Sequence, residues 1–159
     1  MASVALKRST KGTAAERLIL ERFLPYRLSI LSNRVSRAIA ARYAKTFNLT
    51  IPEWRIIAVL GRRPGLTAKE VAEATEMDKV AVSRAVAKLV AAKRVLADVH
   101  DDDGRATSLT LTSQGEALHA RIAPIALDAE RRLLASLNSG ERVQFDALID
   151  RLLGAARDL

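Results

Sequence analysis

Two helix-start signals separated by a short turn constrain this chain more than any other feature. The segment TAKE at residues 67–70 is a capping box, in which the threonine and the glutamate three positions later each bond the other's backbone N–H. It predicts a short helix to about Ala74, and Asp78 stands where the N-cap of another helix belongs. Because only TEMD lies between them, the helices at roughly 68–74 and 79–92 are predicted to form a helix-turn-helix.

The second of these helices carries charge of one sign. Residues 79–94 contain five basic side chains and no acidic one, whereas residues 70–78 contain four acidic groups. Apolar residues at helical spacing are expected to face the core: Val82, Val86, Leu89 and Val90. Small residues are expected on the outside, where they would let the helix enter a DNA major groove: Ala81, Ser83, Ala85 and Ala87. The alternative is an ordinary surface helix with a basic face.

Two alternating segments come directly after this helix. Val95, Ala97 and Val99 alternate with other residues, the polar stretch HDDDGR follows, and then Thr107, Leu109 and Leu111 alternate in the same way. The Asp-Gly pair favours a tight hairpin turn. The chain is therefore predicted to be mainly α with a small β-hairpin wing, in which the acidic run is the tip and the adjacent arginine is what the tip presents.

Helices with apolar stripes are expected before the helix-turn-helix and after the hairpin in the sequence. The first runs over about 25–46, and Thr50 caps the next, which carries Trp54, Ile57 and Leu60 inward. Ser113 opens a long helix that Pro124 should kink, and Ser139 caps the last one. The stripes themselves are these: Leu24, Leu28, Leu31, Val35 and Ile39 in the first helix, and Phe145, Leu148, Ile149 and Leu152 in the last.

These stripes exceed what the core of a small winged helix needs. The chain of residues 1–159 is predicted to be a single unit, with a winged helix-turn-helix lobe at 50–112 and dimerisation helices at 25–47 and 114–157. Pairing with a second copy would place two basic helices about one DNA turn apart, roughly 34 to 36 Å. Packing within one chain is the alternative.

Charge and the content of cysteine and histidine limit the classes of function open to this chain. The formal net charge is +8, and the excess lies in residues 1–45, which hold ten Lys or Arg against two acidic groups. A polyanionic partner such as nucleic acid is one explanation, and a solvated helix face is another. Cysteine is absent, and neither His100 nor His119 falls in a metal-ligand motif, so no metal and no cofactor are expected. Nothing supplies a nucleophile or a paired acid and base, so the chain is predicted not to be an enzyme.

No stretch approaches the about 20 apolar residues of a membrane span, and the N-terminus lacks the features of a signal peptide. A cytoplasmic protein without a membrane partner is expected.

Three segments of the sequence, taken together, resemble a known protein family. The helix-turn-helix, DGRA at residues 103–106 and LTSQG at residues 111–115, in this order and spacing, resemble the multiple-antibiotic-resistance-regulator (MarR) family over about residues 25–155. The resemblance implies a homodimeric winged-helix transcription regulator, usually a repressor, that binds a pseudo-palindromic operator in double-stranded DNA. One position departs from the family: Lys93 stands where a glycine usually ends the recognition helix.

The resemblance also implies which residues contact DNA. Arg105 would be the wing-tip arginine in the minor groove, and Asp103 would orient it. Ser83, Arg84 and Lys88 fall at positions that resemble the recognition-helix contacts of the family, and Lys79 occupies the first turn of that helix. A winged helix that binds only another protein would not need this basic helix.

The family resemblance also bears on a small-molecule ligand. The resemblance implies a small anion, an aromatic acid or an acyl-coenzyme A thioester, in a cleft between the dimer helices and the DNA-binding lobe. Arg27, Arg34 and Arg37 could supply cations, and Trp54 a stacking surface, although Trp54 is also a good core residue. A constitutive DNA-binding protein without any effector is the alternative.

Overall fold

The structure, a computed structural model, describes residues 17–99 and 107–159, and these described residues fall into two units that divide between residues 33 and 34. In the first unit a 3-10 turn at Leu20–Arg22 precedes helix α1 (Leu24–Phe47), which continues into the second unit. Pro25 lies in the first turn of α1, where its missing N–H costs no helical hydrogen bond. The predicted first long helix is therefore present.

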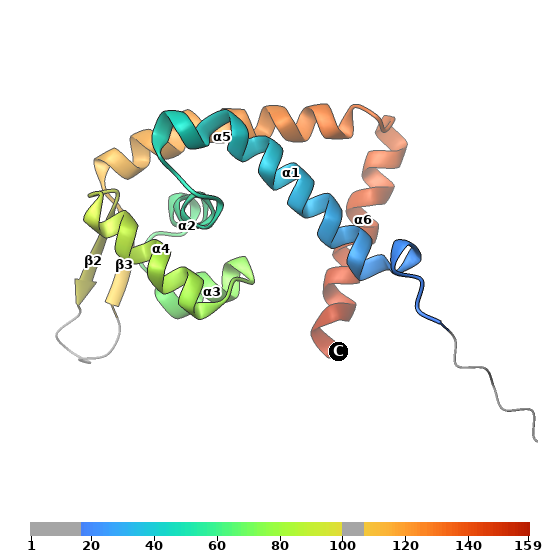
Figure 1. Cartoon of the computed structure of the whole chain (residues 1–159), viewed down its shortest axis with the longest axis horizontal. Coiled ribbons are helices and arrows are strands. Elements are labelled where there is room, and N and C mark those ends of the chain that lie inside the picture. The colour runs from blue at the N-terminus through green and yellow to red at the C-terminus, as the bar shows by residue number, and fades with distance from the viewer. Residues whose placement is uncertain (1–16, 100–106) are drawn as a thin grey trace, which may run out of the picture. The chain divides into compact units, whose positions relative to one another are not determined.

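The second unit contains the remaining elements (Figure 1). In chain order they are α2 (Ile51–Arg62), β1 (Leu66–Thr67), α3 (Ala68–Thr75), α4 (Lys79–Ala91), β2 (Val95–Val99), β3 (Thr107–Leu111), α5 (Ser113–Leu134), α6 (Ser139–Ala155) and a 3-10 turn at Ala156–Asp158. The predicted fold class is confirmed: the chain is mainly helical, with a small antiparallel wing between a helix-turn-helix and the C-terminal helices.

Local capping chemistry sets most helix starts. Thr50 and Thr67 form the predicted capping boxes of α2 and α3, and the Asp78 carboxylate accepts the first backbone N–H groups of α4. Two predicted caps were wrong by one residue. Thr112, not Ser113, caps α5, and Asn138, not Ser139, caps α6. In both places the preceding side chain is also a good cap and adopts the extended backbone that an N-cap requires.

The wing has one more strand than predicted. β2 and β3 pair antiparallel from Val95 opposite Leu111 to Val99 opposite Thr107, as the alternation indicated. The two-residue strand β1 adds to the other edge of β3, so that the order is β1-β3-β2. A strand this short carries no period-2 signal, and sequence alone could not predict it.

Helix α2 is the centre of the core. Ile56, Ile57 and Leu60 are at most 1% exposed, and α2 contacts α3, α4, α5 and β3. Val82 and Leu89 of α4 are each 1% exposed in the same cluster. Burial of each such side chain stabilises the fold by about 1.5 to 3 kcal/mol. Helix α4 and the wing are thus fixed to one packed scaffold.

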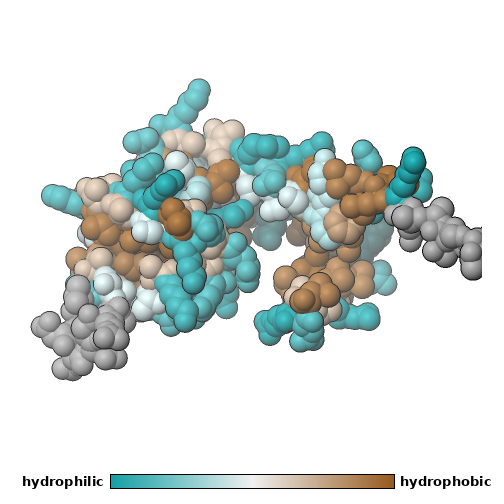
Figure 2. Space-filling model, turned by 60° about the horizontal axis from the view of Figure 1, so that its bottom comes forward, coloured by the Kyte–Doolittle hydropathy of each residue, from teal (hydrophilic) through white to brown (hydrophobic). Residues whose placement is uncertain are grey.

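Both units keep apolar side chains in contact with solvent. In α6 the exposed residues are Val143, Phe145, Leu148, Leu152 and Leu153, and Figure 2 shows a broad hydrophobic surface over this helix. In the first unit the exposed residues are Leu18, Ile19, Leu20, Phe23, Leu24, Tyr26, Leu28 and Leu31. Contiguous apolar surface of this kind marks an interaction site.

Candidate nucleic-acid interface

Helix α4 divides into a buried and an exposed face. Asp78 fixes its first turn by accepting N–H groups from Val80 and Ala81 at 2.9 and 3.1 Å. The side chains that sequence analysis assigned to DNA all lie on the exposed face: Lys79, Ser83, Arg84 and Lys88. The opposite face anchors the helix in the core through Val82, Ala85 and Leu89. The helix is therefore held by one side and offers the other to solvent.

Three details of this helix differ from the prediction. Ala85 was expected outside but is buried at 5% exposure, and Val90 was expected in the core but is 38% exposed. The buried stripe runs through positions 82, 85 and 89, so position 90 falls beyond its edge. Sequence analysis also missed Val80, an apolar residue that is 54% exposed in the first turn. Its three- and four-residue spacing to Ser83 and Arg84 could have placed it on the outer face.

The positive charge of α4 is not neutralised by neighbouring acids. Among the described residues, no ion pair involves Lys79, Arg84 or Lys88. Acids of the preceding segment have other partners: Glu70 completes the cap of α3, where the hydrogen bonds of Thr67 lower the pKa of its carboxyl. Glu73 faces Lys69 at 3.9 Å. The helix can therefore attract a polyanion.

The residue that follows the end of α4 has the left-handed backbone conformation that glycine adopts most easily. Lys93 has a φ of 55°, in the left-handed region, although it is not a glycine. The Lys93 and Arg94 N–H groups donate to the carbonyls of Val90 and Leu89, both at 2.9 Å, which closes the helix end. Such a conformation costs a lysine about 1 to 2 kcal/mol, so the departure from the family changes the residue and not the turn.

The LTSQG segment joins this exit to α5. The Thr112 hydroxyl donates to the Lys93 carbonyl at 2.7 Å and accepts from Gly115 N at 3.1 Å. Thr112 N also donates to the Arg94 carbonyl at 3.1 Å. Gly115 is buried, and a β-carbon there would collide with that carbonyl oxygen. The segment therefore fixes the end of the recognition helix against the start of α5.

The wing tip lies outside the described residues, and with it both predicted wing residues, Asp103 and Arg105. The described part of the wing ends at Val99 and resumes at Thr107, which are paired across β2 and β3. The tip segment thus begins and ends on adjacent strands.

The residues predicted to bind a ligand differ in their exposure and belong to different units of the structure. Arg34 and Arg37 are exposed in the part of α1 that belongs to the second unit, and Arg27 is exposed in the first unit. Trp54 is half-buried, with its ring stacked on His119 at 5.9 Å and tilted against Tyr43 at 6.0 Å between centroids. Trp54 therefore already connects α1, α2 and α5 through aromatic contacts.

A helix-turn-helix with an exposed basic second helix, followed by an antiparallel wing, defines the winged helix-turn-helix DNA-binding proteins. The family model described as "MarR family" matches residues 47–106, which include α2, the helix-turn-helix and the first strand of the hairpin, β2. Over these residues the chain matches the MarR family of transcription regulators, as the resemblance in the sequence implied. That family consists of transcription regulators and not of enzymes, which agrees with the prediction from the sequence.

Similarity to individual proteins extends beyond the matched lobe. The HTH-type transcriptional repressor Rv2887 of Mycobacterium tuberculosis is 29% identical over 131 residues, 82% of this chain and 91% of that protein. A MarR/EmrR family transcriptional regulator from Acinetobacter sp. ADP1 superposes with a TM-score of 0.81 at 26% identity, over 89% of this chain and 100% of that one. The solved complex of Rv2887 with salicylic acid gives a TM-score of 0.65 at 27% identity, over 82% of this chain and 96% of that one.

Two further properties bear on function. No helix in residues 17–99 or 107–159 is long and apolar enough to cross a membrane. The same described residues contain no cluster of three or more His, Asp or Glu side chains that could hold a metal ion.

Proposed function

We propose that this protein is a homodimeric repressor that binds a pseudo-palindromic operator in double-stranded DNA in the cytoplasm and leaves it when a small anion binds. The observation that carries the proposal is the outer face of α4, where Lys79, Arg84 and Lys88 are exposed and have no described ion-pair partner. Lysine and arginine on such a helix reach phosphates and base edges in the major groove. The repressor role draws on the similarity to Rv2887.

Individual roles follow from position on the helix. Lys79 and Ser83 lie in the N-terminal half of α4, which is the part of a recognition helix that contacts base edges. Arg84 and Lys88 lie further along and contact phosphate in this proposal, while Arg105 at the wing tip enters the minor groove with Asp103 orienting it. Val80 joins this set, because an exposed methyl pair suits the methyl group of thymine.

The dimer rests on the exposed apolar side chains at both ends of the chain. In α6, Val143 is 69% exposed and Leu153 is 61% exposed, and in the first unit Leu18 is 68% exposed. Removing such apolar surface from water contributes about 25 cal/mol for each Å², which acts against the entropy that association costs. A two-fold dimer uses the same patch twice and presents two recognition helices, as a two-fold symmetric operator requires.

Release by a small anion is the finer part of the proposal. Its support is the complex of the related Rv2887 with salicylic acid. In this chain Arg27, Arg34 and Arg37 supply cations and Trp54 supplies an aromatic face, and an aromatic acid or an acyl-coenzyme A thioester carries the matching anion. The alternative is a constitutive DNA-binding protein, which differs in that no metabolite weakens its DNA binding.

The role of Arg84 can be tested by the salt dependence of DNA binding. We expect Arg84→Ala to weaken operator binding and to lower the slope of log affinity against log salt by about one for each phosphate that Arg84 neutralises in a half-site. Lys45→Ala is the matched control, because Lys45 is an exposed cation at the end of α1, outside the helix-turn-helix. An unaltered slope in Arg84→Ala would exclude the phosphate contact.

A further inference from the structure

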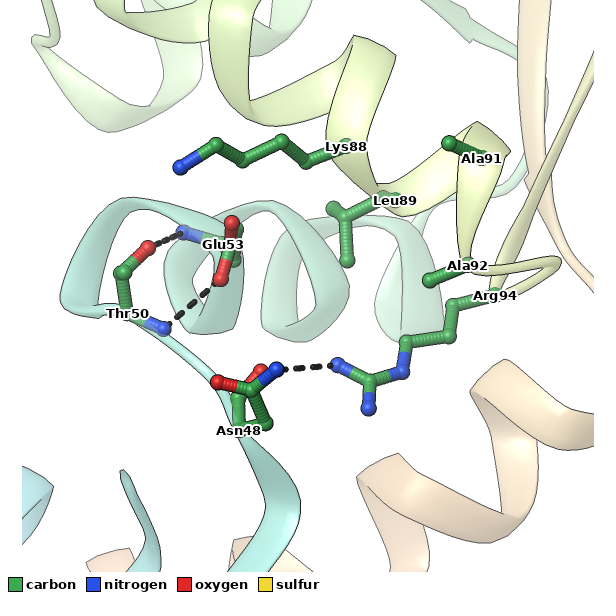
Figure 3. A pocket seen from close by; sticks show the side chains of 8 residues that line it. All are labelled: Asn48, Thr50, Glu53, Lys88, Leu89, Ala91, Ala92 and Arg94. Atoms are coloured by element: carbon green, nitrogen blue, oxygen red, sulfur yellow. Dashed lines mark hydrogen bonds between the residues drawn. The ribbon is translucent and has the colours of Figure 1, made fainter. Parts of the chain in front are cut away.

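The carbonyl groups at the end of α1 are bonded by an arginine that follows the end of α4. The Arg94 guanidinium donates to the carbonyl oxygens of Phe47 at 2.7 Å and Asn48 at 3.3 Å, and Figure 3 shows Arg94 extending toward Asn48. Neither oxygen accepts a backbone N–H from the described residues. The last carbonyls of a helix lack partners within the helix and carry partial negative charge, so a cation is favourable there. Arg94 therefore caps α1.

The two carbonyls that Arg94 bonds belong to a well-defined turn. Asn48 has a φ of 47°, in the left-handed region where helices commonly end. The Leu49 N–H donates to the Ala44 carbonyl at 3.3 Å, and the Leu49 side chain is 3% exposed in the core. The acceptors of Arg94 are therefore fixed by the turn between α1 and α2.

The backbone of Arg94 is held as firmly as its side chain. Its N–H donates to the Leu89 carbonyl at 2.9 Å, and its carbonyl accepts the Thr112 N–H at 3.1 Å. This one residue thus joins the end of α1, the end of α4 and the start of α5. Among the described residues, no other hydrogen bond connects residues 79–94 with residues 24–48.

We propose that Arg94 is a positioning residue for operator binding, which ties α4 to α1 and thereby sets the spacing of the two half-sites that the dimer binds. The inference rests on the proposed function, because it requires a dimer with two recognition helices. Helix α1 carries exposed apolar side chains that the proposed dimer covers, among them Leu24, Leu28 and Leu31. A recognition helix tied to α1 has a narrow range of positions relative to its copy, and a helix released from α1 reaches other spacings.

Binding of the full-length protein to duplexes of different spacing tests this role. The probes carry two copies of the half-site that the wild type selects from random duplex DNA, at the selected spacing or with two base pairs inserted, which turns one half-site by about 70°. We expect the wild type to bind the inserted duplex about tenfold more weakly, and Arg94→Gln to reduce this ratio to about threefold or less. Affinity for a duplex with a single half-site should stay unchanged, because Arg94 acts through position.

Three variants complete the experiment. Arg94→Met removes every hydrogen-bond donor of the side chain, so it should behave like Arg94→Gln. Arg94→Lys retains a cation that can donate to the same carbonyls, so it should restore most of the wild-type ratio. Lys45→Gln is the matched control, since it removes an exposed cation near the same end of α1 that forms no ion pair with a described residue. Circular dichroism and sedimentation velocity check that each variant is folded and dimeric.

Several results would overturn the positioning role. A wild-type ratio in a folded Arg94→Gln or Arg94→Met would exclude it and leave the proposed function intact. Weaker binding of these variants to the single half-site, with a smaller salt slope, would make Arg94 a direct phosphate contact instead. Equal binding of both spacings by the wild type would contradict this inference and the proposed dimeric operator complex together.

Discussion

At the scale of single residues, Gly115 and Thr112 determine how the recognition helix ends. The Thr112 hydroxyl bonds the Lys93 carbonyl and the Gly115 N–H, and Gly115 lies directly against the Arg94 carbonyl. The sequence marked this segment only through a family resemblance. Its physical reason, a backbone approach that no β-carbon permits, depends on residues about twenty positions apart and is visible only in the fold.

Substitution at this contact should be costly. We expect Gly115→Ala to destabilise the protein by about 3 kcal/mol, since a methyl group must displace backbone in a packed site. Gly154→Ala is the control: nothing lies within 4 Å of a β-carbon there, and alanine in a helix should stabilise by up to about 1 kcal/mol. Urea unfolding at one fixed protomer concentration measures both. Equal effects of the two substitutions would contradict the close approach at Gly115.

At the scale of elements, α5 and the second-unit part of α1 meet at one carboxylate. Asp128 accepts hydrogen bonds from Arg42 of α1 at 2.9 Å and from Arg131 at 3.3 Å, and Arg132 lies 3.1 Å away. The hydrogen bond from Arg42, followed by the nearby arginine charges, lowers the pKa of the Asp128 carboxyl. Nearby, the Arg121 guanidinium lies 4.6 Å from the centroid of the Phe47 ring. Charged side chains at the surface therefore hold α5 against the second-unit part of α1.

This ion-pair cluster predicts a pH dependence of stability. Because the pKa of Asp128 is lower in the folded than in the unfolded state, its contribution is present above the ordinary aspartate value and disappears as the pH falls through the folded value. Asp128→Asn should therefore lower the melting temperature at pH 7, and the difference should shrink below about pH 4. Asp150→Asn on the exposed surface of α6 is the control. A difference from wild type that is independent of pH would contradict this role.

Elements were predictable where the signal is local. The capping boxes of α2 and α3 and the Asp78 cap of α4 each involve side chains within one turn, and all were recognised correctly. Errors arose where two neighbours were equally suitable, as at the starts of α5 and α6. The exchange of Ala85 and Val90 between faces had another cause: the angle at which a helix packs is set by its neighbours and not by its own sequence.

At the scale of the whole molecule, the chain combines a well-packed lobe with helices whose apolar side chains are left in solvent. The buried cluster draws on α1, α2, α3, α4, α5 and the wing, whereas no residue of α6 is buried. The charge excess of the first 45 residues indicated a polyanionic partner.

The most direct test of the account is selection of bound sequences from random duplex DNA by the purified protein. A homodimer with two α4 helices should enrich one two-fold symmetric motif, with half-site centres about one helical turn apart, roughly 34 to 36 Å. Arg84→Ala should bind that motif more weakly than wild type, because it removes a cation that we propose contacts phosphate. Enrichment of no motif, or of a single asymmetric site, would contradict the claim that this chain is a dimeric operator-binding regulator.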